Sequence, residues 1–172
     1  MQRRGRERAL TSKNHKSDPS GEGPILVAVD FSDDSRQALT WACKVAAALG
    51  ASIVLLHVVH DPAEAPGYYR HDMKDAMRPM EDVAKKMMRN FLKEVRHANP
   101  RNKALKNLET QLVTGLPVTR ILKAADKMNA RMIVMGSQGR TGLAHLLVGS
   151  KAEQVVRMAK IPVTIVKAPE KE

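Results

Sequence analysis

Short apolar runs alternate with segments of helical periodicity along most of this chain, and the alternation restricts the fold more than any other feature. The first run, 25–30, is apolar up to its terminal Asp30, as expected of a parallel strand buried on both faces. Similar runs occupy 52–59, 107–114, 131–136 and 162–167. The sequence therefore predicts five strands, each separated from the next by a helix.

The helical segments carry start and stop signals. The first begins near an N-cap supplied by Ser32 or Asp33 and ends before Gly50. A charged pattern over 75–98 predicts the second helix, and Pro117 suits the first turn of the third. The apolar face of the first helix is predicted to contain Ala38, Leu39, Ala42, Val45, Ala46 and Leu49.

The fourth helix is predicted to begin at Ser150. The sequence SKAE places this serine at the N-cap and Glu153 three residues later, which is the spacing of a capping box. Parallel strands need crossover connections, so five strands alternating with four helices predict an α/β fold, a doubly wound parallel sheet with helices on both faces. The buried stripe of the fourth helix is predicted to contain Ala152, Val155, Val156 and Ala159.

The chain has 172 residues, 43% of them apolar, which is enough for one domain with its own core. We place this domain at 23–172. Six of the first twenty residues are lysine or arginine and no apolar periodicity is present there, so 1–22 is predicted to be a flexible basic tail. The net charge of +11 favours anionic partners such as nucleotides, nucleic acid or acidic membranes.

Other features narrow the class of protein. The single cysteine, Cys43, permits no internal disulfide and is interpreted as a small buried hydrophobe. The N-terminus lacks the apolar segment of a secretory signal, and no long apolar window suggests a membrane span, so we expect a soluble cytoplasmic protein. Because aromatic residues make up only 3% of the chain, few bases could stack on it, and nucleic acid is an unlikely partner.

Between Met135 and Ser150 the sequence reads MGSQGRTGLAHLLVGS, where glycines recur after the fourth predicted strand. A P-loop would require Gly-Lys-Ser/Thr, whereas Gly149-Ser150-Lys151 reverses the lysine and the hydroxyl. The dinucleotide fingerprint would require Gly-x-Gly near the start of the fold, whereas the first spacing here is Gly136-x2-Gly139. Both of these phosphate-binding motifs are therefore excluded.

The order Gly136-x2-Gly139-x9-Gly149-Ser150 resembles that of the ATP-binding branch of the universal stress protein family. The resemblance extends over 24–168 and includes VAVDFS at the first strand, LLHVV at the second, VTGLP before the third helix and a terminal PVTIVK. It implies the strand order 3-2-1-4-5 of the adenine nucleotide alpha hydrolase-like fold. It also implies an ATP-binding stress-response or regulatory protein that forms a homodimer through the final strand, Val163 to Val166.

By the same resemblance, ATP, with Mg²⁺, would lie across the carboxyl ends of the strands. The base would lie near Ala28 and Val58, and Asp30 would lie near the ribose. Lys151 could add positive charge at the start of the fourth helix, where unpaired N–H groups favour an anion. The residues expected around the sugar and phosphates are Gly136, Ser137, Gly139, Arg140, Gly149 and Ser150.

Several of these residues also have structural explanations. Asp30 could serve only to cap the first helix, and Ser150 only to cap the fourth. His57 has no His, Cys or carboxylate partner at ligand spacing, so it is interpreted as a packed or hydrogen-bonded histidine, and no metal site is predicted. The segment 61–79, with its prolines and glycine, is interpreted as a surface connection.

Two alternative functions stay open, and a third is rejected. A slow ATPase or phosphotransfer enzyme stays open, although Asp30 is the only carboxylate expected at a strand end and no catalytic residue is assigned. A family member without nucleotide, acting through protein or nucleic-acid contacts, also stays open. A response-regulator receiver is rejected, because it would need an aspartate at the end of the third strand, where this chain reads LVTGLP.

Overall fold

The computed structural model describes residues 23–60, 74–138 and 148–169. Five parallel strands form one sheet in the order β3-β2-β1-β4-β5. This order confirms the predicted doubly wound fold and places β3 and β5 at the two edges. The strands are β1 (Ile25–Ala28), β2 (Ile53–His60), β3 (Glu109–Gly115), β4 (Met132–Gly136) and β5 (Val163–Val166).

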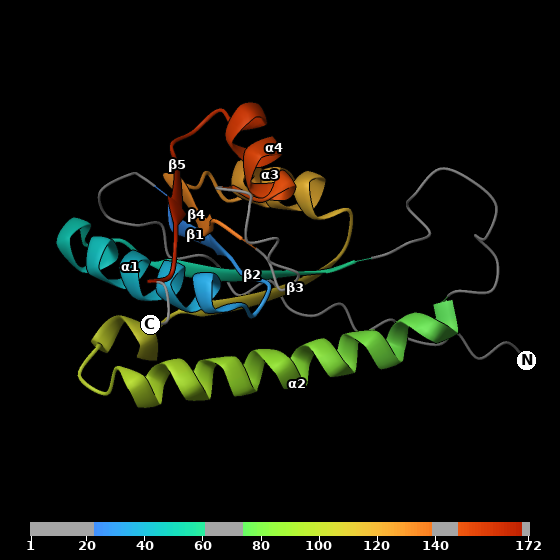
Figure 1. Ribbon diagram of the computed structural model, residues 1–172, viewed down its shortest axis with the longest axis horizontal. Coiled ribbons are helices and arrows are strands. Elements are labelled where there is room, and N and C mark those ends of the chain that lie inside the picture. Colours follow the sequence, from blue (N-terminus) through green and yellow to red (C-terminus); the bar gives the residue numbers. More distant parts are fainter. Residues whose placement is uncertain (1–22, 61–73, 139–147, 170–172) are drawn as a thin grey trace, which may run out of the picture.

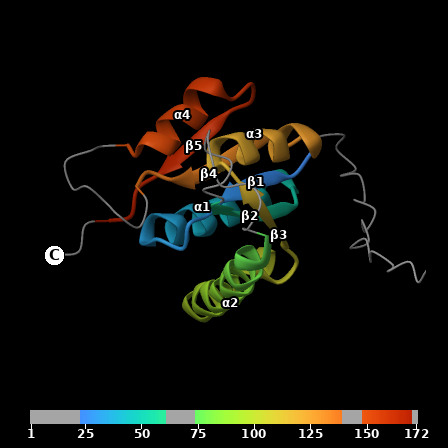
Figure 2. The same ribbon diagram turned by 90° about the vertical axis from the view of Figure 1, so that its right-hand side faces the viewer.

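Helices cover both faces of the sheet. In Figure 1, α3 and α4 lie above the sheet and α1 and α2 below it, and Figure 2 shows the same two layers from the side. None of the helices in the described ranges combines the length and the apolarity that a bilayer crossing requires. The helices are α1 (Asp33–Leu49), α2 (Lys74–Ala98), the short 3-10 helix η2 (Lys103–Lys106), α3 (Pro117–Lys127) and α4 (Ser150–Met158).

Alternate residues of the central strands supply the two halves of the core. Ile25 and Val27 of β1 pack on the side of α1 and α2, whereas Leu26 and Ala28 pack on the side of α3 and α4. Each of these four side chains is at least nine-tenths buried. Successive side chains of a strand point to opposite faces, so a strand covered on both sides must be apolar at every position, as the first run is.

The ends of α1 and the start of α3 follow the sequence signals. Ser32 is the N-cap of α1, and its side chain accepts a hydrogen bond from the Ser35 N–H at 3.2 Å. Gly50 has a left-handed φ of 63° after the last residue of the helix, a conformation that favours glycine. Pro117 is in the first turn of α3, where its missing N–H costs no helical hydrogen bond.

The start of α4 corrects the predicted capping box. Gly149, not Ser150, is the N-cap, and no side chain caps this end. Gly149 is held in an extended conformation by its own N–H, which donates to the Ser137 carbonyl at 2.7 Å. The helix therefore begins one residue earlier than the capping box predicts, and Ser150 is its first residue and not its N-cap.

Some expected boundaries and buried positions also differ. Leu49 is 50% exposed and Val156 is 48% exposed, because each lies at the margin of its helix's apolar stripe rather than facing the sheet. Ala159 follows α4 and packs half-buried against the core. Pro79, expected in a surface connection, lies within α2, beyond its first turn. The predicted tail 1–22 and the segment 61–73 lie outside the described residues.

Candidate functional site

The carboxyl ends of β1 and β4 lie side by side at the centre of the sheet. The chain proceeds outward from β1 to β2 and β3, then returns to the other side of β1 to form β4. As a result, α1 and α4 leave these adjacent strands toward opposite faces. In open α/β sheets this reversal creates the crevice in which ligands bind.

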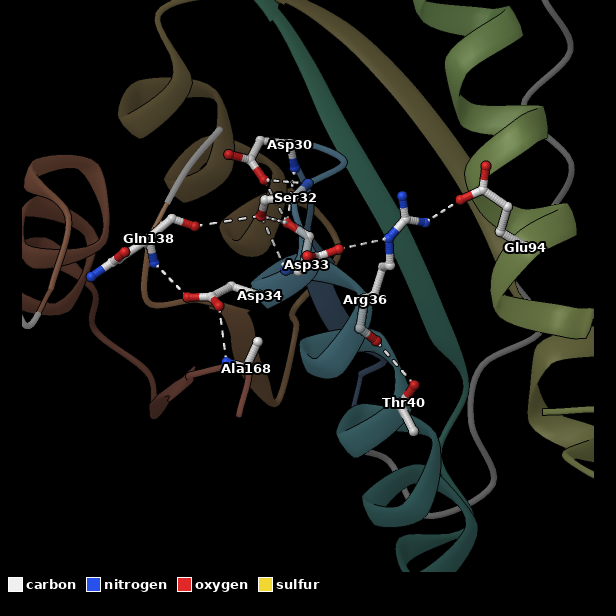
Figure 3. A network of polar contacts seen from close by, with 10 residues as sticks. Asp30, Ser32, Asp33, Asp34, Arg36, Thr40, Glu94, Gln138 and Ala168 are labelled. Carbon is white, nitrogen blue, oxygen red and sulfur yellow. Dashed lines mark hydrogen bonds and ion pairs between the residues drawn. The ribbon is translucent and has the colours of Figure 1, made fainter. Parts of the chain in front are cut away.

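The exit from β1 is fixed by hydrogen bonds to the first turn of α1 (Figure 3). Asp30 Oδ1 accepts from the Ser32 N–H at 3.1 Å and from the Ser35 hydroxyl at 2.7 Å. Ser35 is 2% exposed and also accepts from the Asp30 N–H at 3.1 Å. Ser32 is the N-cap of α1, so Asp30 does not cap the helix, the structural role that the sequence offered; its carboxylate instead fixes the turn between β1 and α1.

The next residue, Phe31, has a φ of 69°, an uncommon conformation for a bulky side chain. Its ring lies 4.2 Å from the His57 ring and 5.6 Å from the Phe91 ring, measured between centroids. His57 Nδ1 lies 2.8 Å from the Val29 carbonyl oxygen. The interpretation of His57 as a packed, hydrogen-bonded histidine is confirmed, and its contacts hold the ends of β1 and β2 together.

The exit from β4 is tied to α1 by Asp34. Asp34 Oδ2 accepts from the Ser137 hydroxyl at 2.6 Å and from the Gln138 N–H at 2.8 Å, and its Oδ1 accepts from the Ala168 N–H at 2.9 Å. Ser137 is 3% exposed. Ser137 was expected beside the sugar and phosphates, but its hydroxyl is already used inside the protein.

Gly136 allows α1 to approach β4 closely. A Cβ added at this position would lie 2.7 Å from Asp34 Cβ and 3.0 Å from the backbone N of Ser35. Separations under 3.0 Å are not tolerated by real Cβ atoms, so the glycine is required for packing whatever its relation to a ligand.

The two described ends of the glycine-rich segment meet. Gly149 N donates to Ser137 O at 2.7 Å, and a Cβ at Gly149 would lie 3.3 Å from the same oxygen. The first helical hydrogen bond of α4 runs from Glu153 N to Gly149 O, so the N–H groups of residues 150–152 have no acceptor within the helix. Ser150 and Lys151 are exposed beside them, whereas Gly139 and Arg140 lie outside the described residues.

The two residues expected near the base belong to one apolar cluster. Ala28 ends β1 and is 7% exposed, and Val58 of β2 is half-buried against the cluster beneath α3 and α4. The carboxyl ends of β1 and β2 thus carry apolar side chains, and N–H groups without a helical acceptor lie at the start of α4. Such a combination suits a ligand with a flat apolar part and an anionic part.

Asp34 and Ser35 were not found by sequence reasoning. An acidic residue in the first turn of a helix is explained sufficiently by the helix dipole, so nothing local indicates that Asp34 contacts residues more than a hundred positions away. For Ser35 the available signal was its position three residues after Ser32 in the sequence DFSDDS, but that spacing is explained sufficiently by a helix cap.

Within the described residues no group of three or more His, Cys, Asp or Glu side chains is arranged to hold a metal ion.

The sequence matches the universal stress protein family over residues 23–167. A universal stress protein of Methanocaldococcus jannaschii is 30% identical over 148 residues, covering 86% of this chain and 84% of the relative. A putative universal stress protein of Staphylococcus aureus is 30% identical over 149 residues, covering 85% of this chain and 84% of the relative.

Solved structures show the same fold. The universal stress protein UspA from Lactobacillus plantarum superposes with a TM-score of 0.67 at 25% identity, covering 84% of this chain and 98% of its own. A universal stress protein in complex with cAMP gives 0.57 at 29% identity, covering 84% and 96%. One from Archaeoglobus fulgidus in complex with dAMP gives 0.53 at 25% identity, covering 84% and 98%. The family match, the relatives and the fold agree, and the chain belongs to the universal stress protein family.

Proposed function

We propose that this protein is an ATP-binding regulatory protein of the stress response, with the nucleotide lying across the carboxyl ends of β1 and β4. The observation that supports this most directly is the hydrogen bond from Gly149 N to Ser137 O, which brings both described ends of the glycine motif together at the carboxyl end of β4. Relatives in complex with cAMP and dAMP indicate that adenine nucleotides are the ligand class.

The described residues suggest how the nucleotide is held. The adenine lies along the apolar border formed by Ala28 and Val58, and the ribose lies toward Asp30. The phosphates face the N–H groups at the start of α4, with Lys151 supplying positive charge. The family resemblance adds Gly139 and Arg140, which lie outside the described residues, to the expected phosphate contacts. Mg²⁺ arrives with the nucleotide and is held mainly by its phosphates, as is usual for this ion.

A regulatory role fits the site better than efficient hydrolysis. Phosphoryl transfer benefits from a residue that orients the attacking water or accepts its proton. At the described strand ends the candidate is Asp30, whose Oδ1 already accepts hydrogen bonds from Ser32 and Ser35. The bound nucleotide would therefore act as a signal, and the protein would perform this role in the cytoplasm.

We further propose that β5 pairs with β5 of a second copy. Pro162 O accepts a hydrogen bond from Ile133 N of β4, and Val166 O accepts one from Ser137 N, just past the end of β4. Backbone groups of alternate strand residues point to the same neighbour, so those of Val163 and Ile165 point to the open edge. An apolar edge strand with unpaired backbone groups is a template for another strand, and pairing in a two-fold dimer would cover it.

The nucleotide proposal is tested on purified protein in two steps. Denaturation followed by mass spectrometry detects any nucleotide that copurifies. Calorimetric titration of Mg-ATP into the stripped protein then measures affinity, with Mg-GTP as a control for the base and cAMP and dAMP as controls for the phosphates. We expect ATP to bind more tightly than GTP.

The absence of both bound nucleotide and heat at millimolar ATP would overturn the proposal. Gly139→Val provides a site-directed test, because its side chain would occupy the approach to the phosphates. We expect this variant to lose ATP binding while its urea midpoint stays near that of the wild type. Unchanged affinity would show that the phosphates lie elsewhere.

A further inference from the structure

The carboxylate of Asp34 joins three segments that are distant in the sequence (Figure 3). It lies in the first turn of α1 and accepts from Ser137 and Gln138, where the chain leaves β4. Its other oxygen accepts from the N–H of Ala168, where the chain has left β5. A single side chain therefore connects the start of the glycine-rich segment with the end of an edge strand.

A second connection reinforces the first. The N–H of Ser137 donates to the Val166 carbonyl at 2.8 Å, and the carbonyl of Ser137 accepts from Gly149 at 2.7 Å. Ser137 is thus bonded through its hydroxyl, its N–H and its carbonyl to three different elements. A shift of the backbone at Ser137 cannot occur without moving its partners in α1, β5 and the start of α4.

The chemistry of the side chain matters for this junction. A carboxylate has two acceptor oxygens and no donor, which matches the three donors that face Asp34. A carboxamide of the same shape has one oxygen and one NH₂ group, so it would point a donor at one of these donors. Asp33 provides a matched comparison, because its neighbouring carboxylate is 58% exposed and its Oδ1 accepts from Arg36 Nε at 3.4 Å.

We propose that Asp34 is a positioning residue that couples nucleotide occupancy to the end of β5. When phosphates bind at the N–H groups that begin α4, the hydrogen bond from Gly149 to Ser137 and, with it, the contacts of Asp34 to Ser137 and Gln138 become more ordered. The contact to Ala168 is then strengthened through the shared carboxylate. Coupling between two sites is reciprocal, so the Ala168 contact also raises the affinity for nucleotide. This inference rests on the proposed nucleotide function.

The experiment compares wild type, Asp34→Asn and Asp33→Asn by calorimetric titration of Mg-ATP and by hydrogen exchange of the Ala168 amide with and without Mg-ATP. In the wild type we expect ATP to slow exchange at Ala168. In Asp34→Asn we expect ATP affinity to fall by about fivefold or more, which is within the usual range of coupling, and the slowing at Ala168 to disappear. Asp33→Asn changes the charge equally, so it controls for long-range electrostatics and should behave like wild type.

Ser137→Ala serves if Asp34→Asn does not fold, because it removes one donor and leaves the Gln138 and Ala168 contacts in place. It should reduce the ATP-induced slowing at Ala168 without abolishing it. The inference is overturned if the wild type binds ATP with no change at Ala168, or if ATP affinity in Asp34→Asn equals that in Asp33→Asn. An absence of ATP binding by the wild type overturns the proposed function itself, and this inference with it.

Discussion

Gly136, at the end of β4, packs directly against Asp34 in the first turn of α1, where a Cβ on the glycine would lie 2.7 Å from Asp34 Cβ. The contact sets the distance between a central strand and the helix that begins beside it. It also brings the Asp34 carboxylate within hydrogen-bond reach of Ser137 and Gln138. The first glycine of the motif is thus a packing residue that positions polar groups at the exit from β4.

Gly136→Ala is expected to destabilise the protein by about 1–3 kcal/mol, the usual cost of overpacking a tight core contact. The loss should appear as a lower urea midpoint with little change in slope. Gly149→Ala is the comparison: its Cβ would lie 3.3 Å from Ser137 O, a tight contact but a looser one than at Gly136, and its φ of −69° suits alanine, so we expect a smaller loss. Equal stability of Gly136→Ala and wild type would contradict the packing role.

Lys151→Ala is expected to weaken ATP binding by about 0.5–1 kcal/mol, as for an exposed charge beside an anion. The effect should diminish with added salt, because the side chain is exposed. Arg157→Ala is the control, since it removes an exposed cation from the last turn of the same helix. Equal losses in the two variants, measured calorimetrically at low and high salt, would argue against phosphates at the start of α4.

Ile165→Pro is expected to make the protein monomeric. The N–H of residue 165 points to the open edge, so proline removes an outward donor without removing a hydrogen bond to β4. Ile165→Ala controls for the loss of side-chain packing and should remain dimeric. Sedimentation analysis distinguishes the two, and a dimeric Ile165→Pro would place the interface elsewhere.

The stability of the protein is expected to fall above about pH 8.5 through the titration of Cys43. Burial raises the pKa of the Cys43 thiol to about 11, partly opposed by a hydrogen bond with Asn102, whereas an exposed thiol titrates near 8.5. The folded state thus favours the protonated form, and this contribution is complete below the unfolded pKa. It is lost between about pH 8.5 and 11, by at most about 3 kcal/mol.

Urea denaturation of wild type and Cys43→Ala across this pH range isolates the effect, because the other titrating groups are common to both proteins. As the pH rises, the wild type should lose stability relative to Cys43→Ala. A difference that stays constant from pH 7 to 11 would show that the thiol titrates normally. In native protein at pH 8 the thiol should also react slowly with an alkylating reagent.

The fold was predictable because its signals are local. Continuous apolar runs mark strands covered on both sides, and Ser32, Gly50 and Pro117 lie at helix ends where their conformational preferences are strongest. The strand order came from the family resemblance, since alternation alone does not specify which strands are neighbours. The capping box at Ser150 was wrong because a distant carbonyl, that of Ser137, fixes the preceding residue.

The positions of the strand ends were predictable at the level of segments, whereas the contacts between side chains there were not. The sequence placed Asp30 and Gly136 at strand ends; Gly136 ends β4, and Asp30 lies two residues beyond the end of the adjacent strand β1. It did not indicate that the Ser137 hydroxyl bonds to Asp34, because that contact spans 103 positions and depends on the register of β4 against β1. Nor does any local pattern predict a left-handed φ at Phe31.

The hydrogen bond between Gly149 and Ser137 affects how much the length of the sequence between them matters for stability. This bond holds residues 137 and 149 next to each other, so the folded scaffold, and not the residues between them, fixes the ends of the connecting segment. Loop-closure entropy grows only by about 0.6 kcal/mol for each doubling of length. Changes in the length of the sequence between these two residues should therefore cost the fold little stability.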